Sequence, residues 1–232
     1  MRYIFVIFFH YVKAIHGGFA CKRTRQHRHT NMKKKAVFII NLISGTSSKA
    51  GVPNLIEQTL DKEKFDYEIA ITEYAGHASE IASRAKDNGV DVVVAVGGDG
   101  TVNEVARAIV HSNTALGIMP CGSGNGLARH LLLPMNLRKS IEIINQCEIH
   151  DLDYGIINGY PFFCTCGMGF DAFVSQKFAE AGKRGPITYA ENILREGLKY
   201  KPETYVLQDE NGTNQYKAFL ISCANASQYG NN

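Results

Sequence analysis

The stretch Val90–Thr101, VDVVVAVGGDGT, contains the clearest structural signal in this sequence of 232 residues. Its first seven residues are valine and alanine except for one aspartate, a pattern typical of a strand buried on both faces of a parallel sheet. The glycines that follow predict a tight turn, and Gly100–His111 is predicted to be a helix. A buried strand, a glycine turn and a helix in succession indicate an α/β fold.

The same order of elements extends from this stretch in both directions along the chain. Strands are predicted at Ala36–Asn41, Tyr67–Thr72, Val90–Val96 and Ala115–Pro120, and helices around Val52–Leu60, Ala78–Asn88, Gly100–His111, Asn125–Leu133 and Leu137–Gln146. This alternation predicts an α/β domain over residues 32–147, with an open, mostly parallel sheet and helices flanking both of its faces.

From about residue 148 the pattern changes to pairs of strands. A hairpin is predicted over 149–163 with its turn at Asn158–Gly159, and two helices are predicted to follow at about Ala172–Ala181 and Ile187–Tyr200. A second strand pair is predicted between Thr204–Gln208 and Gln215–Ala224, around Asn211–Gly212. Residues 148–232 are therefore expected to begin an antiparallel β-sandwich domain that stops before it is complete.

Charge separates the first 31 residues from the rest. No acidic residue precedes Glu57, whereas from Met32 onward 19 basic residues face 22 acidic ones, a net charge of −3. The body of the chain therefore has no bulk basic surface of the kind that binds nucleic acid. Residues 1–31 are interpreted as a weak signal peptide, as a lipid anchor around Cys21, or as a leader outside the fold before a true start at Met32, and the last is favoured.

Two compositional features bear on where the protein acts. The longest apolar run, Tyr3–Phe9, is far shorter than the ~20 residues of a membrane-spanning helix. The six cysteines lack metal-binding spacing, which suits a reducing compartment better than a disulfide scaffold. Both features predict a cytoplasmic protein.

Three glycine-containing turns follow predicted strands at the edge where open α/β sheets bind their ligands. They are Asn41–Gly45, Gly97–Thr101 and Gly122–Arg129. Glycine lets a backbone approach phosphate oxygens, and a helix N-terminus directs N–H groups toward them. Three such turns on one edge predict a phosphate cradle with room for a nucleotide, although neither the P-loop pattern nor G-x-G-x-x-G fits.

Longer motifs then carry a family resemblance. GGDGTVNEVA (Gly97–Ala106) followed by PCGSGNGLAR (Pro120–Arg129) resembles the catalytic domain of the diacylglycerol kinase and sphingosine kinase family. Supporting matches are N-x-x-S-G from Asn41, T-x-x-x-G-H-A from Thr72 and GMGFDA over Gly167–Ala172. The resemblance implies an ATP-dependent lipid kinase that transfers the γ-phosphate of ATP to a hydroxyl of diacylglycerol or of a sphingosine-like lipid. It also implies Mg²⁺ as a cofactor and peripheral contact with the membrane that holds the lipid.

The resemblance also implies roles for individual residues. The implied ATP-binding residues are Asn41, Ser44, Gly45, Thr72, Gly97, Gly98, Asp99, Gly100, Thr101, Val102, Asn103, Glu104, Gly122, Ser123 and Gly124. Asp99 would also be the catalytic residue, orienting the lipid hydroxyl or accepting its proton, although an aspartate there can also simply cap a helix. Glu104 would contact the ribose or orient the loop. Asp171 would bind the polar end of the lipid, or would cap a helix that starts at Ala172.

Departures from the family pattern keep other functions open. Leu42 stands where the family has proline, and the family's closing D-G-E segment is absent from this sequence. The chain is therefore interpreted as a C-terminally truncated copy. The alternatives are an NAD kinase-like enzyme that shares only GGDGT, and a non-catalytic fragment that binds nucleotide or lipid.

Overall fold

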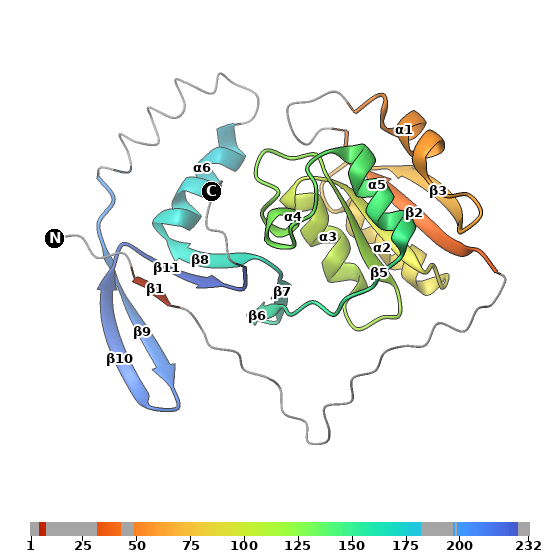
Figure 1. Cartoon of the computed structure of the whole chain (residues 1–232). Helices are drawn as coiled ribbons and strands as arrows, with labels where there is room; N and C mark the ends of the chain where they lie inside the picture. The colour runs from red at the N-terminus through yellow and green to blue at the C-terminus, as the bar shows by residue number, and fades with distance from the viewer. Residues whose placement is uncertain (1–4, 8–31, 43–48, 182–196, 198, 227–232) are drawn as a thin grey trace. The chain divides into compact units, whose positions relative to one another are not determined.

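The structure is a computed structural model that describes residues 5–7, 32–42, 49–181, 197 and 199–226 (Figure 1). Contacts group these residues into two compact units. The α/β unit comprises the described residues 32–42, 49–164 and 226, and the β-rich unit comprises 5–7, 165–181, 197 and 199–225. This grouping does not test where an independently folding domain begins, so the domain boundary near residue 148 stays a prediction.

The α/β unit is built around one parallel sheet (Figure 1). Its elements are β2 (Lys34–Ile40), α1 (Val52–Thr59), β3 (Phe65–Ile71), α2 (His77–Asp87), β4 (Val92–Gly97), α3 (Asp99–Ile109), β5 (Ala115–Pro120), α4 (Gly126–His130), α5 (Leu137–Gln146), β6 (Gly155–Ile157) and β7 (Tyr160–Phe162). The four long strands run in the order β3-β2-β4-β5, and each neighbouring pair is parallel. The predicted fold class is confirmed.

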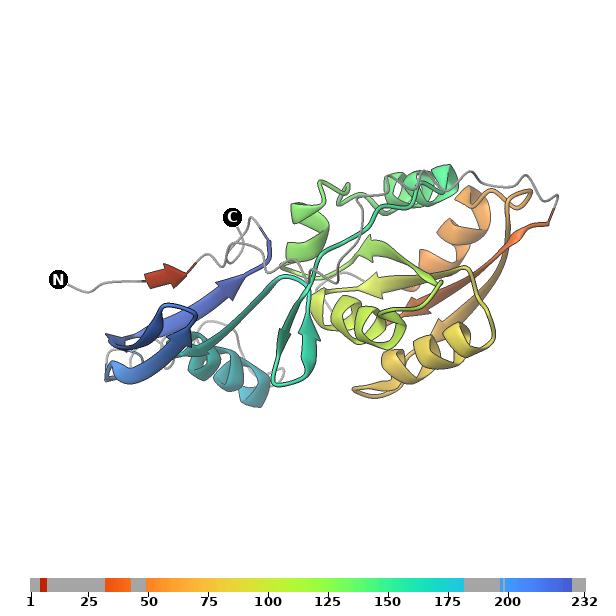
Figure 2. The same cartoon turned by 90° about the horizontal axis from the view of Figure 1, so that it is seen from below.

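Alternation along the strands gives the sheet a hydrophobic core on each face. Val37 and Ile39 of β2 pack with α2 and α3, whereas Phe38 and Ile40 pack with α1 and α5. Figure 2 shows these helix pairs on opposite faces of the sheet. All six residues of β4 are buried, as the valine-rich run predicts for a central strand.

The helices begin and end close to their predicted bounds, except for α4. Its predicted range, Asn125–Leu133, is too long, because Leu132 adopts the left-handed backbone conformation with φ 56°. The Leu133 N–H donates to Ala128 O at 2.8 Å and the Leu132 N–H to Arg129 O at 3.0 Å. These two bonds form a Schellman motif, which ends the helix.

The short hairpin of β6 and β7 packs against the sheet's helices. Its turn residues, Asn158 and Gly159, have φ values of 51° and 81°, which confirms the predicted two-residue turn. The side chain of Arg107 in α3 donates a hydrogen bond from Nε to Pro161 O at 2.8 Å. The hairpin is thereby attached to the helix that begins at the glycine-rich turn.

The β-rich unit contains β1 (Phe5–Ile7), β8 (Thr165–Gly169), α6 (Phe170–Ala181), β9 (Glu203–Asp209), β10 (Gly212–Ala218) and β11 (Leu220–Ala224). The strand predicted over Gln215–Ala224 is wrong, because two strands replace it on either side of Phe219. β10 pairs with β9 across a turn at Glu210–Asn211, whereas β11 pairs with β8 and, in parallel, with β1. The ring of Phe219 packs on Phe170 at 4.8 Å between centroids, which draws the chain away from the hairpin.

Two further predictions concern segments that the structure describes only in part. Of the leader at 1–31, only Phe5–Ile7 is described, and most of the helix predicted over Ile187–Tyr200 lies outside the described residues. Across the described ranges, every helix is too short or too polar to span a membrane.

Candidate active site

The strand order predicts a ligand-binding crevice at one edge of the parallel sheet. From β2 the chain first crosses to β3 on one side and later to β4 on the other, so β2 and β4 flank the point where the winding reverses. Connections leave the carboxyl ends of two such strands in opposite directions, which opens a ligand-binding crevice. Asn41, Gly98 and Gly122 follow β2, β4 and β5 at this edge.

The turns after β4 and β5 touch through their backbones. A Cβ atom on Gly122 would lie 2.5 Å from the Cα of Gly98, and a Cβ on Gly98 would lie 3.1 Å from the Cα of Gly122. Neither backbone can move aside as a flexible side chain would, so these two positions require glycine. The two turns therefore contact each other through main-chain atoms.

Helix α3 begins directly in this crevice. Gly98 is its N-cap residue and has no side chain to accept hydrogen bonds from the first backbone N–H groups. These N–H groups and the positive end of the helix dipole favour a bound anion such as a phosphate. The side chain of Val102, one of the implied ATP-binding residues, packs into the core instead, and so leaves only its backbone for such a role.

Asp99 does not cap its own helix. Its Oδ1 accepts a hydrogen bond from the backbone N–H of Gly126 at 2.7 Å, which joins the first turn of α3 to the first turn of α4. Cys164 lies beside this contact, since a Cβ atom on Gly126 would be 3.2 Å from Cys164 Sγ. Burial and the nearby Asp99 charge together raise the pKa of the Cys164 thiol. The carboxylate is thus held in a fixed place between two helix N-termini.

The turn from Gly122 to Gly126 is held by one asparagine. Asn125 adopts the left-handed conformation with φ 53°; its Oδ1 accepts from Gly122 N at 2.8 Å, and its Nδ2 donates to Gly122 O at 2.7 Å. Arg129 donates from Nε to Gly124 O at 2.9 Å, while Ser123 is exposed to solvent. The loop therefore keeps a fixed shape around Gly122.

The turns after β2 and β3 join the same site. The side chain of Asn41 donates from Nδ2 to Thr101 Oγ1 at 3.2 Å, and its backbone N–H donates to Val96 O at 3.1 Å. Thr72 is buried, and its backbone N–H donates to Ile40 O at 2.9 Å. Candidate residues from the ends of all four parallel strands are thereby brought to one edge.

Glu104 links α3 to the turn that precedes α2. Its Oε1 accepts a hydrogen bond from the backbone N–H of Gly76 at 3.1 Å, and Gly76 has a φ of 90°. His77 is held next to that turn, because its Nδ1 accepts from Glu73 N at 3.2 Å and its ring stacks on Tyr74 at 4.5 Å. This geometry supports the interpretation of Glu104 as a residue that orients the loop.

Lys49 is a site residue that the sequence analysis missed. It is only 4% exposed, and its Nζ donates to the backbone oxygen of Asn41 at 2.5 Å. Burial lowers the pKa of the Lys49 ammonium, and the charge of nearby Cys121 acts in the opposite direction. A lysine eight residues after Asn41 in a loop of small polar residues was the available signal.

The remaining candidate residues are Ser44, Gly45 and Asp171. Ser44 and Gly45 lie outside the described residues. Asp171 belongs to the β-rich unit, where α6 begins at Phe170 and not at Ala172. Asp171 therefore lies inside the first turn of the helix, and its interpretation as the N-cap residue is wrong.

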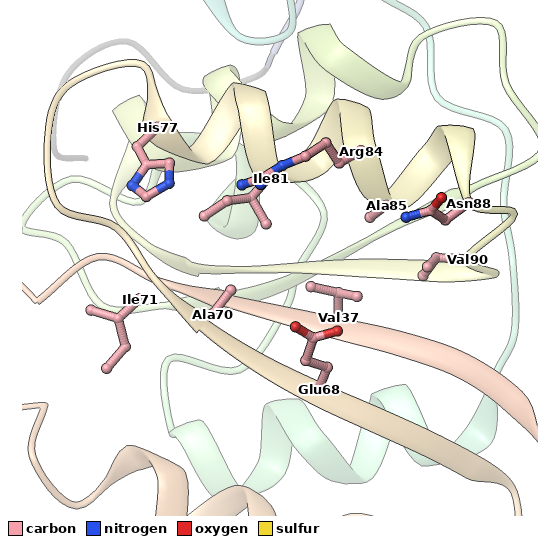
Figure 3. A pocket seen from close by; sticks show the side chains of 10 residues that line it. All are labelled: Val37, Glu68, Ala70, Ile71, His77, Ile81, Arg84, Ala85, Asn88 and Val90. Atoms are coloured by element: carbon pink, nitrogen blue, oxygen red, sulfur yellow. The ribbon is translucent and has the colours of Figure 1, made fainter.

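A groove of about 320 Å³ lies elsewhere in the α/β unit, between the edge strand β3 and helix α2. Figure 3 shows Glu68 on the strand and Arg84 on the helix as parts of its two walls, with His77 at one end. None of the glycine turns lines this groove. Phosphate recognition by backbone N–H groups needs the open crevice at the sheet edge, so the groove is a separate feature.

Comparisons with known proteins identify one family over most of the α/β unit. The diacylglycerol kinase catalytic domain family matches residues 35–157. A diacylglycerol kinase of Staphylococcus saprophyticus is 34% identical over 163 residues, which cover 68% of this chain and 53% of the relative. One of Staphylococcus aureus is 32% identical over 163 residues, covering 68% of this chain and 51% of the relative.

A solved structure shows the same fold. The crystal structure of a diacylglycerol kinase from Bacillus anthracis str. Sterne aligns with a TM-score of 0.64 at 22% identity, covering 85% of this chain and 68% of that one. The chain spans about half the length of the two staphylococcal relatives. Since the family match covers more than half of the chain, the protein belongs to the diacylglycerol kinase catalytic domain family.

Proposed function

We propose that this protein is an ATP-dependent lipid kinase that transfers the γ-phosphate of ATP to a lipid hydroxyl. The observation that carries the proposal is the contact between the Gly98 and Gly122 backbones at the reversal point of the sheet. Family membership supports it, because relatives over the same region are named diacylglycerol kinases. The lipid would be diacylglycerol or a sphingosine-like molecule.

The ATP phosphates would lie over the first turn of α3. Backbone N–H groups at Gly98–Gly100 would donate to phosphate oxygens, as helix N-termini do in many phosphate sites. The Lys49 ammonium, held on the backbone of Asn41, would add a positive charge from the neighbouring strand end. The glycine pair lets the turns after β4 and β5 approach each other, because a Cβ atom at either position would meet the opposite backbone, and it would thereby gather their N–H groups around the phosphates.

Asp99 would act on the lipid hydroxyl, either by orienting it or by accepting its proton. In the transfer, the lipid oxygen forms a bond to the γ-phosphorus while the bond from that phosphorus to the β,γ-bridging oxygen breaks. The hydroxyl proton leaves toward the Asp99 carboxylate, and ADP departs. Most of the catalysis in such reactions comes from positioning and charge stabilisation, which suits a carboxylate fixed by the Gly126 N–H.

Mg²⁺ would neutralise phosphate charge when bound with ATP. The residues that the structure describes include no group of three or more His, Cys, Asp or Glu side chains that could hold a metal by themselves. Mg²⁺ in kinase sites is commonly held by one or two carboxylates together with substrate phosphates, and Asp99 fits that role.

Asp171, a residue of the β-rich unit, would bind the polar end of the lipid. The protein would work in the cytoplasm, in peripheral contact with the membrane.

A second candidate is a protein that binds nucleotide or lipid without transferring phosphate. The observation that favours it is that Asp99 Oδ1 already accepts a hydrogen bond from Gly126 N at 2.7 Å, a contact that a purely structural carboxylate would also make. The two candidates share the crevice and differ only in turnover.

The test is transfer of label from γ-labelled ATP with Mg²⁺ by the 232-residue chain. The acceptors are diacylglycerol, monoacylglycerol, sphingosine and ceramide, with NAD⁺ in parallel. Asp99→Asn is the decisive variant, because an amide oxygen can still accept from Gly126 N while the charge is lost. Asp87→Asn, on the exposed end of α2, is the matched control.

Label in a lipid with the wild type and Asp87→Asn, but not with Asp99→Asn, supports the kinase with a catalytic Asp99. Equal activity in Asp99→Asn means that Asp99 serves only to hold α4. Label on NAD⁺ alone overturns the proposal in favour of an NAD kinase-like enzyme. Nucleotide binding without transfer supports the second candidate.

A further inference from the structure

The chain segment that follows α4 holds a leucine in an unusual backbone conformation. Leu132 occupies the left-handed position of the Schellman motif, where glycine is the common residue because it has no Cβ. Its side chain is 89% exposed, so packing in the α/β unit does not compensate for the strain. The backbone here would favour glycine, and the exposed leucine therefore calls for another explanation.

Neighbouring side chains extend the apolar surface around Leu132. Leu131 is 38% exposed and Met135 is 36% exposed. Leu133, in contrast, packs against the core of the α/β unit and anchors the segment. We call Leu131–Met135 the apolar tip. It is an exposed cluster on a fixed turn rather than a single scattered residue.

The chain segment around the apolar tip carries basic residues and no acidic ones. No Asp or Glu occurs between Glu104 and Glu142, a stretch that contains four Arg and Lys residues. Arg138 and Lys139 are exposed in the first turn of α5. Arg138 is directed by a hydrogen bond from its Nη1 to Thr59 Oγ1 at 3.0 Å. Basic side chains around apolar ones suit an anionic membrane surface.

We propose that the apolar tip inserts into the interface of a membrane that contains anionic lipids, with Arg138 and Lys139 contacting the headgroups. The proposal rests on the proposed function, since a lipid kinase must meet its substrate at a bilayer. It adds the surface that makes the contact.

The tip is also close to the proposed phosphate site along the chain. Helix α4 has five residues and so rises roughly 6 Å from its first residue to its last. Its first residue, Gly126, is bonded to Asp99, and its last residue precedes the tip. Insertion of the tip would therefore bring a bilayer surface within a short distance of the glycine turns. A second copy of the chain is the other occupant that the test must exclude.

The experiment measures flotation of the full chain with vesicles, without ATP or turnover. Vesicles of phosphatidylcholine with phosphatidylserine are compared with vesicles of phosphatidylcholine alone. Leu132→Gly is the decisive variant, because it removes the side chain while relieving the left-handed backbone. It should unfold at the same or a higher temperature, so loss of binding would not reflect misfolding. Ile156→Ser, at another exposed apolar position of the same unit, is the control.

The wild type and Ile156→Ser should bind the anionic vesicles, and Leu132→Gly should bind them about tenfold or more weakly. Arg138→Gln with Lys139→Gln should weaken binding only when phosphatidylserine is present, and added salt should do the same. Undiminished binding by Leu132→Gly overturns the proposal. A change of oligomeric state in Leu132→Gly by sedimentation, with vesicle binding unchanged, assigns the tip to a second copy instead. These outcomes leave phosphate transfer untouched as a separate result.

Discussion

The central strand β4 and the hairpin strand β10 have opposite surroundings. Every residue of β4 is buried, whereas in β10 all residues but Ala218 are exposed. β4 lies between two strands and under helices on both faces, while β10 pairs only with β9 among the described residues. The stability of the described structure is therefore concentrated in the α/β unit.

The same difference explains where the candidate site lies. The glycine turns follow strands that are packed on both faces, so the backbone groups in these turns are held firmly in position. A turn at the end of an exposed hairpin lacks such support. We therefore expect substitutions in and around the parallel sheet to reduce stability and ligand binding far more than equivalent substitutions in β9 and β10.

The largest difference should come from truncating one apolar side chain in the parallel sheet and one in the exposed hairpin of β9 and β10. Phe38→Ala should lower the free energy of unfolding by about 3–5 kcal/mol, because Phe38 is fully buried beneath α1 and α5. Val206→Ala in β9, where the side chain is 59% exposed, should change it by no more than ~0.5 kcal/mol. Urea denaturation followed by circular dichroism measures both, and similar losses in the two variants would contradict the comparison.

The next effect concerns the contact between the two glycine turns. Gly122→Ala should weaken nucleotide binding by roughly 100-fold, because its Cβ would push the turns after β4 and β5 apart. Gly51→Ala is the control, since a Cβ there meets nothing within 4 Å. Calorimetric titration with ADP gives the affinities. A Gly122→Ala protein that binds ADP normally would exclude the crevice as the nucleotide site.

A smaller effect is expected from the buried cation. Lys49→Met should weaken ADP binding by about tenfold, the cost of one charge-assisted hydrogen bond. Because burial lowers the pKa of Lys49, the wild type should lose affinity as the pH rises toward 10.5, and Lys49→Met should lack this pH dependence. Titrations with ADP across alkaline pH test this, with Lys62→Met on the surface as control.

The lowered pKa of Lys49 also affects how the stability of the protein depends on pH. Between the lowered pKa and 10.5 the unfolded chain binds more protons at Lys49 than the folded one, so this group makes stability rise with pH. The rise should disappear in Lys49→Met. An unchanged pH dependence of both affinity and stability in that variant would remove Lys49 from the site.

The smallest effect should come from a helix cap in the α/β unit. Asn136 accepts a hydrogen bond from Lys139 N at 3.1 Å and begins α5. Asn136→Ala should lower the free energy of unfolding by about 1 kcal/mol. Asn136→Ser should retain most of the stability that the cap contributes, because serine can also accept the hydrogen bond. Chemical denaturation distinguishes them. Equal losses would mean that the hydrogen bond contributes nothing.

The sequence alone predicted the α/β unit well and the β-rich unit poorly. The run VDVVVAV and the other buried strands can be recognised from the sequence, because burial on both faces demands apolar residues at nearly every position. The exposed strands lack such a run of apolar residues, so the sequence predicts one strand over Gln215–Ala224 although Phe219 divides it. Only the packing of Phe219 on Phe170 places that break.

For the candidate site, the sequence by itself determined which turns are rich in glycine and which carboxylate stands among them. The tertiary structure alone decided that Gly98 and Gly122 touch, that Asp99 binds the N-terminus of a neighbouring helix, and that Lys49 is buried beside Asn41. The physical reason is that residue type limits the local backbone, whereas contacts between distant turns depend on the order in which the strands assemble.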